Sequence, residues 1–137
     1  MVIDGKNLVL GRLASQVAKK LLNGEEVHVA NCEGIVIIGN PQKIIENYII
    51  RRRLQHKGTP EFSPKWPKVP FLLVRRIIRG MLPWKSLRGK EAFKRLRVYS
   101  GNPKNLQLAT IDVAKFNSEA RYICIGDLCK QLGHSVK

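Results

Sequence analysis

At 137 residues, with 44% hydrophobic residues and a formal net charge of +15, the chain is long enough for one domain and too apolar for wholesale disorder. Its three cysteines form no CxxC pair, which argues against a disulfide framework or a standard zinc site. The sequence contains no run of eighteen apolar residues, so no membrane-spanning segment is predicted. We therefore expect one cytosolic domain over residues 1–137, with no metal and no cofactor.

The first half of the chain alternates short apolar runs with helical periodicity. Strands are predicted at residues 2–3, 27–30 and 35–38, the last of which is all apolar and suited to burial on both faces. Helices are predicted at 12–22, ended by Asn23 and Gly24, and at 41–53, where Asn40 is a good N-cap and Pro41 fits the first helical position. This order favours an α/β fold with helices packed on a small parallel or mixed sheet.

The centre of the chain interrupts this alternation. Residues 56–70 contain four of the seven prolines, with Phe62 and Trp66 between lysines. Because proline lacks an N–H donor and restricts the residue before it, neither a helix nor a central strand fits here. We predict an extension or loop that is functional, since long irregular stretches usually are, and that is loose when the chain is free.

Two short basic helices are predicted between residues 74 and 96, separated by Gly80 and Pro83. A strand at 97–99, a turn at 101–103, a strand at 122–125 and a helix at 126–132 complete the predicted elements.

Positive charge is concentrated in the same central part of the chain. Residues 51–104 contain 16 lysines and arginines against two acids, Glu61 and Glu91, whereas the other residues are nearly neutral. Such a distribution indicates a surface dedicated to a polyanion, and we predict an RNA-binding region at 51–104. The simpler alternative is a solvated basic surface without a partner.

The spacing of the arginines indicates how such a surface would work. Arg75, Arg76 and Arg79 share one face of a helix, and guanidinium groups bind phosphate through two parallel hydrogen bonds. A rigid, many-charged face suits double-stranded RNA, whose base edges are hidden in a deep groove. Trp66 and Trp84 can stack on unpaired bases or, alternatively, pack the chain onto its own core.

The sequence offers little support for catalysis or metal binding. No GxGxxG or GxxxxGK[ST] motif follows a predicted strand, and no histidine has a partner at a motif spacing. Cys124 and Cys129, with His134 nearby, match no common metal site, so core packing is the favoured interpretation. We predict that the protein is not an enzyme and takes no small-molecule substrate.

From residue 79 to 103 the sequence RGMLPWKSLRGKEAFKRLRVYSGNP resembles the ribosomal protein L13 family, in which an RGMLP turn leads to a G-x-x-A helix and a strand ending in G-x-P. Residues 10–20, LGRLASQVAKK, and 31–43, NCEGIVIIGNPQK, are similar to the same family. RRRLQHKGTP, residues 51–60, resembles its archaeal and eukaryotic branch, and the lack of a long C-terminal extension favours the archaeal type.

This resemblance implies a fold and a function. It implies a three-layer α/β/α domain around a small four-stranded parallel or mixed sheet, with a basic, proline-containing insertion. It also implies a structural constituent of the large ribosomal subunit in the cytoplasm, which binds large-subunit ribosomal RNA, helps early assembly, and lies as a monomer among neighbouring ribosomal proteins. A free RNA-binding translational regulator that uses the same basic face is the alternative.

The expected RNA contacts follow from the family match and from the basic pattern. The match assigns them to Arg51, Arg52, Arg53, His56, Lys57, Arg79, Lys85, Arg88, Lys90, Lys94 and Arg95. The basic pattern adds Lys65, Lys68, Arg75 and Arg76, with Trp66 and Trp84 as candidates for base stacking.

Overall fold

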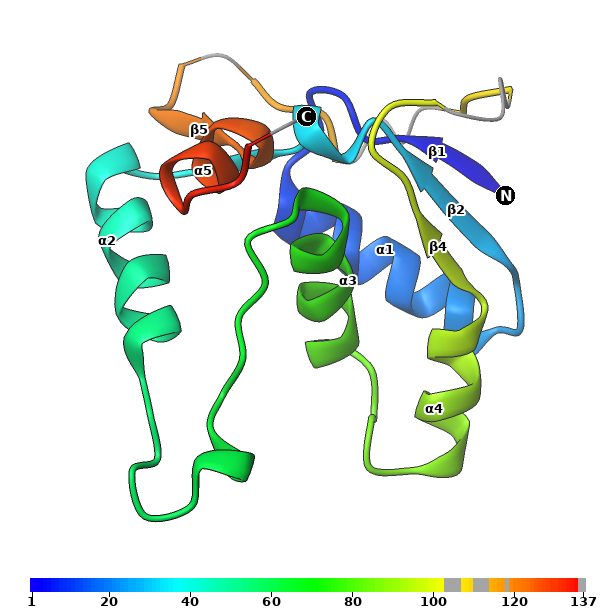
Figure 1. The fold of residues 1–137 in the computed structure, drawn as a ribbon. Coiled ribbons are helices and arrows are strands. Elements are labelled where there is room, and N and C mark those ends of the chain that lie inside the picture. The colour runs from blue at the N-terminus through cyan, green and yellow to red at the C-terminus, as the bar shows by residue number, and fades with distance from the viewer. Residues whose placement is uncertain (103–106, 110–113, 118, 136–137) are drawn as a thin grey trace.

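A computed structural model describes residues 1–102, 107–109, 114–117 and 119–135 (Figure 1). In chain order the elements are β1 (Val2–Asp4), α1 (Leu10–Leu22), β2 (Val27–Ala30), η1 (Cys32–Gly34), β3 (Val36–Ile38), α2 (Pro41–Arg53), η2 (Pro60–Phe62), α3 (Pro70–Gly80), α4 (Leu87–Lys94), β4 (Leu96–Val98), β5 (Tyr122–Cys124) and α5 (Ile125–Gln131). Pro103 of the predicted turn and Lys104 of the predicted basic region lie outside the described residues.

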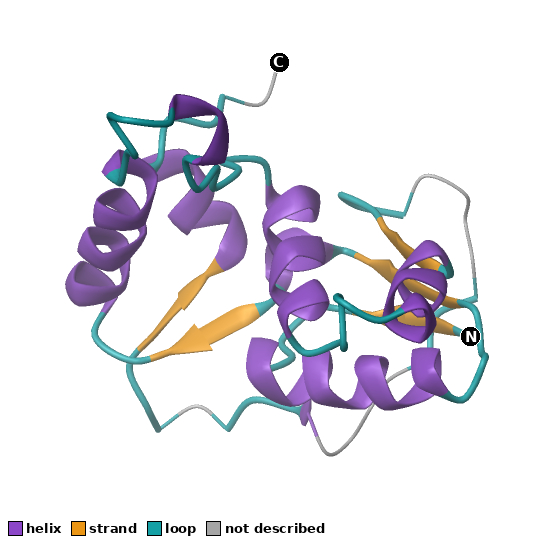
Figure 2. Cartoon of the chain, turned by 90° about the horizontal axis from the view of Figure 1, so that it is seen from below, coloured by secondary structure: helices purple, strands orange, loops and turns teal. Residues whose placement is uncertain are grey.

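The described strands form two small sheets. β1, β2 and β4 pair in parallel in the order β1-β2-β4, and β3 pairs with β5 in an antiparallel sheet. Seen from below, the two sheets lie on opposite sides of α3 (Figure 2). The α/β class is therefore confirmed.

The sheet is smaller than the four strands expected. In the described residues a fourth chain segment joins β1 only through Ala109, which forms a single parallel bridge with Ile3. β3 reaches the N-terminal segment only at Val36, whose N–H donates to the Leu8 carbonyl at 2.8 Å, and its other pairing goes to β5. The predicted burial of residues 35–38 is confirmed for Ile35 and Val36, which are 0% and 1% exposed, and is wrong for Ile38, which this two-stranded sheet leaves 44% exposed.

The hydrophobic core lies between the parallel sheet and α1 and α3. The buried side chains of α1 follow the predicted stripe and include Leu13, Val17 and Leu21. Burial alternates along the strands, so the opposite sheet face carries the half-exposed His28 and the exposed Arg97. One face of the sheet is thus apolar and covered, and the other is polar.

The helix bounds show which residues determine where the helices begin. Asn40 caps α2, accepting a hydrogen bond from the Gln42 N–H at 3.1 Å, and Pro41 is the first residue of the helix, as predicted. α3 begins at Pro70, four residues before the predicted start, because Pro70 occupies the first helical position instead of ending the extension. None of the helices in the described part of the chain has the length and apolar character needed to cross a membrane.

Candidate nucleic-acid interface

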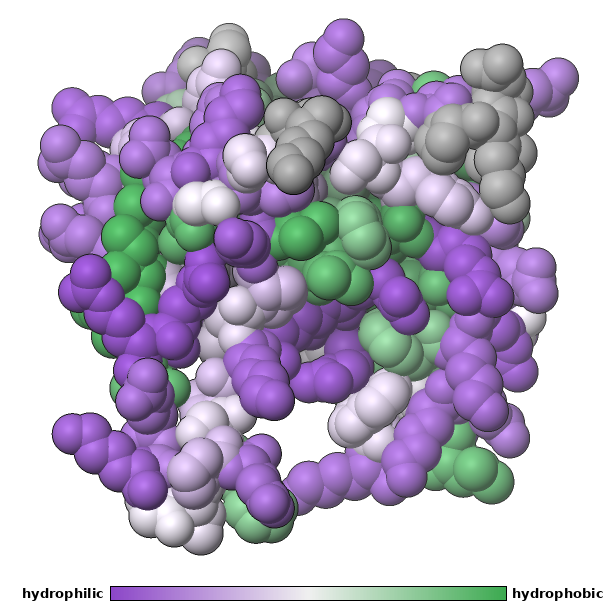
Figure 3. All heavy atoms as spheres, in the orientation of Figure 1, coloured by the Kyte–Doolittle hydropathy of each residue, from purple (hydrophilic) through white to green (hydrophobic). Residues whose placement is uncertain are grey.

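The basic region folds into an arch with two legs. α2 and the extension at residues 54–69 form the first leg, residues 81–94 with α4 form the second, and α3 lies between them (Figure 1). In the space-filling view an open gap separates the legs and is bordered mostly by hydrophilic side chains (Figure 3). We refer to residues 41–94, which comprise both legs and α3, as the basic arch.

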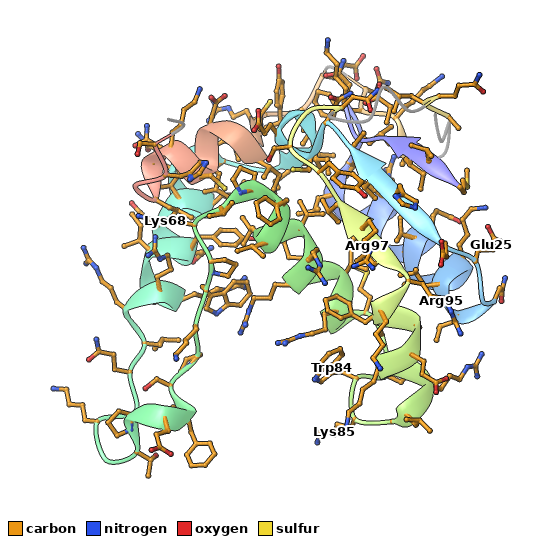
Figure 4. The ribbon with its side chains drawn as sticks, turned by 45° about the vertical axis from the view of Figure 1, so that its right-hand side comes forward. Glu25, Lys68, Trp84, Lys85, Arg95 and Arg97 are labelled. Carbon is orange, nitrogen blue, oxygen red and sulfur yellow. The ribbon has the colours of Figure 1, made fainter. Side chains whose placement is uncertain are left out.

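The arch brings most of the predicted RNA-contact residues together. The predicted residues with exposed side chains are Arg51, Arg52, Arg53, His56, Lys57, Lys65 and Lys68 on the first leg and Lys85, Arg88, Lys90 and Lys94 on the second. Figure 4 shows Lys68 on the first leg and Trp84 and Lys85 on the second.

No carboxylate neutralises this charge within the described structure. The ion pairs between described residues, Lys20 with Glu25 at 3.7 Å and Lys130 with Asp127 at 3.3 Å, both lie outside the arch. Unpaired cations held on a folded backbone attract a polyanion and release its condensed counterions on binding. The geometry therefore fits a phosphate backbone.

The three arginines of α3 are stacked on aromatic rings. The Arg75 guanidinium lies 5.0 Å from the centre of the Phe93 ring, Arg76 lies 4.5 Å from Trp66, and Arg79 lies 5.0 Å from Trp84. These distances are within the range of cation–π attraction. The arginines are consequently half-buried and held in position, rather than fully exposed on the helix as the sequence suggested.

Trp66 fastens the extension to the rest of the arch. Its ring meets Tyr48 of α2 edge to face, with centroids 5.9 Å apart, and the Arg51 guanidinium lies 5.1 Å from its centre. With Arg76 it is therefore held by residues of α2 and α3. This arrangement is the packing alternative for Trp66, and base stacking by this residue stays a prediction.

Trp84 is more open than Trp66. It is 38% exposed, contacts Phe93 edge to face at 5.1 Å, and carries Arg79 over its ring. Part of its surface remains accessible to a ligand.

The crowding of positive charge on α3 has electrostatic consequences. Burial, together with the neighbouring Arg79 charge, lowers the pKa of the Arg76 guanidinium. The buried Nε of Arg75 has no hydrogen-bond partner among the described residues. An anion placed beside these arginines would relieve the repulsion between them.

Two clefts flank Arg79. One, of about 280 Å³, is lined by Pro67, Leu72, Arg75, Arg76, Arg79 and Phe93. The other, of about 540 Å³, is lined by Arg79, Gly80 and residues 82–86, which include Trp84 and Lys85. The inner surface of the arch is therefore indented on both sides of one arginine.

Two of the predicted contact residues also hold the fold together. Arg52 donates a hydrogen bond from Nη1 to the Leu132 carbonyl at 2.7 Å, which joins α2 to the end of α5. Arg95 donates from Nη1 to the Leu21 carbonyl at 3.3 Å, near the end of α1. For these arginines a loss of RNA binding on substitution would not by itself demonstrate RNA contact.

The sequence patterns missed two supports of this surface. Arg97, which belongs to the same basic run, lies outside the arch, exposed on β4. Phe93 and Tyr48 support guanidinium groups, but their partners come from other elements, so no local pattern indicated this role.

The cysteines do not form a reactive or metal-binding site. Cys129 and Cys32 are fully buried, and burial raises the pKa of Cys129 to about 12 and that of Cys32 to about 11. Among the described residues, no group of His, Cys, Asp and Glu side chains is arranged to hold a metal ion. Core packing, which the sequence favoured for both Cys124 and Cys129, is confirmed for Cys129, whereas Cys124 is only half-buried.

Comparison with known proteins adds an independent finding. A family model described as "Ribosomal protein L13" matches residues 1–105. The protein "Large ribosomal subunit protein uL13" of Methanocaldococcus jannaschii is 47% identical over 96% of this chain and 96% of its own length. Proteins of the same name in Methanopyrus kandleri and Archaeoglobus fulgidus are 43% and 38% identical, over 98% and 96% of this chain and 87% and 86% of their own lengths.

Proposed function

The chain belongs to the ribosomal protein L13 family, and on this premise we propose that its basic arch binds ribosomal RNA of the large subunit. It is a structural protein of the ribosome, not an enzyme, and its setting is that of the cytoplasmic ribosome. Large-subunit ribosomal RNA and adjacent ribosomal proteins are the corresponding partners, with the chain present as a monomer.

One observation carries this proposal: Arg75, Arg76 and Arg79 are held in position on aromatic rings, and no cation of the arch is paired with a carboxylate of the described residues. Fixed positions matter because a flexible basic segment must be ordered when it binds, whereas a pre-formed surface avoids most of that cost. The legs on either side of α3 would meet phosphates from two directions, which supports a clamp on folded RNA.

We also propose that residues 1–137 act as one domain that binds RNA early in assembly of the particle. The described helices and strands contribute to one hydrophobic core, and the arch is braced by internal contacts of Trp66 and Phe93. A protein surface that is already ordered before RNA binds can fix the conformation of the RNA without a large change in its own conformation.

Removal of exposed charge tests the RNA-binding surface. Replacing Lys57, Lys65 and Lys85 by Gln removes three cations from the arch, all of them exposed. For each phosphate that is no longer neutralised, the slope of log affinity against log salt should fall by about 0.7–0.9. Replacing Lys6, Arg12 and Lys19 by Gln is the matched control, since these residues are also exposed but lie outside the arch.

We expect weaker binding to a large-subunit RNA fragment and a flatter salt slope for the arch variant, with little change for the control. Equal effects of the two variants would mean that binding depends on net charge alone. Density-gradient sedimentation separates a structural role from that of a free regulator: a structural component should travel with large subunits at one copy each after a moderate salt wash.

A further inference from the structure

We propose that the cleft beside Arg76, lined by Pro67, Leu72, Arg75, Arg76, Arg79 and Phe93, holds one unpaired nucleotide that is turned out of the bound RNA. This inference rests on the proposed function, because it names the part of the RNA that the centre of the arch takes. The protein would then recognise an unpaired nucleotide in the RNA in addition to binding its phosphates.

The walls of the cleft are chemically mixed in a way that suits a nucleotide. Pro67, Leu72 and Phe93 supply apolar surface, and Leu72 is 38% exposed. The phosphates of a paired stem need cations but gain nothing from such a wall, because the apolar faces of paired bases are hidden in the stack. An unpaired base has an exposed flat face that gains from contact with it.

The arginines of the cleft suit the phosphate of a nucleotide as well as its base. A guanidinium donates hydrogen bonds from its edge and stacks with its face, so that it can meet both a phosphate and a base. In this cleft Arg75 and Arg76 are each supported by a ring, Phe93 and Trp66, which holds them ready for contact.

The size of the cleft limits what can enter. Its volume of about 280 Å³ lies near the lower end of the range for small-molecule pockets, roughly 300–1,000 Å³. A duplex cannot fit inside it, whereas a single extruded base with its phosphate at the rim can. Extrusion costs least where a base is already unpaired, so a bulge or an internal loop is the expected source.

The test compares two RNA hairpins of the same stem sequence, one fully paired and one with a single unpaired adenosine. The intact chain should bind the bulged hairpin at least about fivefold more tightly, the lower end of what stacking of one base contributes. A fluorescent adenine analogue at the unpaired position should change its emission on binding, because the base leaves water and meets the cleft wall.

Replacing Leu72 by Gln removes apolar wall while preserving charge and approximate size. We expect this variant to lose the preference for the bulged hairpin and to bind the paired hairpin as before. Leu87→Gln is the matched control, since Leu87 is 73% exposed on α4 and does not line the cleft. It should keep the preference.

The outcomes separate this inference from the function on which it rests. Equal, salt-dependent affinity for both hairpins would overturn the nucleotide site and leave RNA binding by the arch intact. A preference for the bulge that survives in Leu72→Gln would also overturn it, because the unpaired base would then bind elsewhere. Failure of both hairpins to bind would refute the RNA-binding function itself and the nucleotide site with it.

Discussion

Trp66 connects three parts of the arch through a single ring. Arg51 and Arg76 lie 5.1 and 4.5 Å from its centre, and Tyr48 meets it edge to face. The extension that carries Trp66 has little regular structure, and this ring attaches it to α2 and α3. The order of the extension and the placement of two arginines therefore depend on the same residue.

Replacing Trp66 by Leu should loosen the extension without changing the charge of the protein. Removal of the aromatic pair and of two cation–π interactions should cost about 1–3 kcal/mol. We expect faster cleavage by trypsin after Lys65 and Lys68, which flank the ring, and a lower affinity for RNA at fixed salt. Proteolysis followed by mass spectrometry locates the cuts.

Phe62→Leu is the control for this variant, because Phe62 lies in the same extension but is 77% exposed. It should leave cleavage after Lys65 and RNA affinity unchanged. In the unaltered protein we expect Lys57, in the exposed part of the extension, to be cut well before Lys65. The looseness predicted from the prolines would then be confined to the tip, and equally fast cleavage at the two sites would contradict the anchoring by Trp66.

The thiols give a second prediction about single residues. Burial raises the pKa of Cys32 from 9.0 to about 11, so at pH 8 the folded protein carries roughly a hundredfold less Cys32 thiolate than an unperturbed thiol would. Burial disfavours the thiolate, so the contribution of Cys32 to stability decreases as the pH rises. The stability that this burial contributes is complete below pH 9 and is lost as the pH rises through 11.

We therefore expect Cys32 and Cys129 to resist alkylation at pH 8 until the protein unfolds, and the half-buried Cys124 to react first. Labelling followed by peptide mapping, with and without urea, measures this. Rapid labelling of Cys129 in the folded protein would show that the core opens there more readily than its full burial indicates.

At the scale of elements, the second leg depends on a tight turn before α4. Ser86 caps the helix by accepting a hydrogen bond from the Gly89 N–H at 3.3 Å, and its hydroxyl donates to the Pro83 carbonyl at 2.8 Å. Gly89 packs directly against that carbonyl, so a β-carbon there would overlap it. The position of Trp84 and Lys85 follows from this turn.

Gly89→Ala should consequently force the turn away from α4. Such overpacking typically costs about 1–3 kcal/mol, and the displaced leg should also weaken RNA binding. Gly80→Ala is the control: Gly80 ends α3, its added β-carbon would meet nothing within 4 Å, and stability should be unchanged or slightly raised. Urea denaturation of both variants measures the difference, and similar midpoints would show that the turn yields easily.

The elements also show what a sequence can predict. α1, β2 and α2 follow from apolar periodicity and from Asn40 and Pro41, because burial and capping act within a few residues. The pairing of β3 with β5 was not predicted, since it joins Ile37 to Ile123 across most of the chain. The support of Arg51 by Trp66 was missed because it depends on how the extension folds back onto α2, although each residue lies in a stretch recognised as basic.

The roles of individual arginines could not be predicted from the sequence either. Sequence assigned Arg52, Arg95 and Arg76 alike to RNA, yet Arg52 and Arg95 hydrogen-bond to carbonyls of distant elements. Charge content is visible in a sequence, whereas the choice between an internal and an external partner depends on tertiary packing. The candidate surface could thus be located, but its internal supports could not.

For the whole molecule, the arch predicts that the two legs contribute to binding separately and together. The legs lie on opposite sides of α3 (Figure 1), so RNA held between them should touch both. Replacing Lys57 and Lys65 by Gln strips charge from the first leg, and replacing Lys85 and Lys90 by Gln strips it from the second. These residues are all exposed and none forms an ion pair in the described structure, so stability should change little.

Each pair of substitutions should weaken binding to a large-subunit RNA fragment and lower the salt slope by up to about 1.4–1.8, if both lysines meet phosphates. Because distant sites without shared partners act nearly independently, the free-energy losses should add in the fourfold variant. Titrations at several salt concentrations measure both quantities. If one pair of substitutions has no effect, the RNA contacts a single leg, and the prediction that it binds between the two legs is wrong.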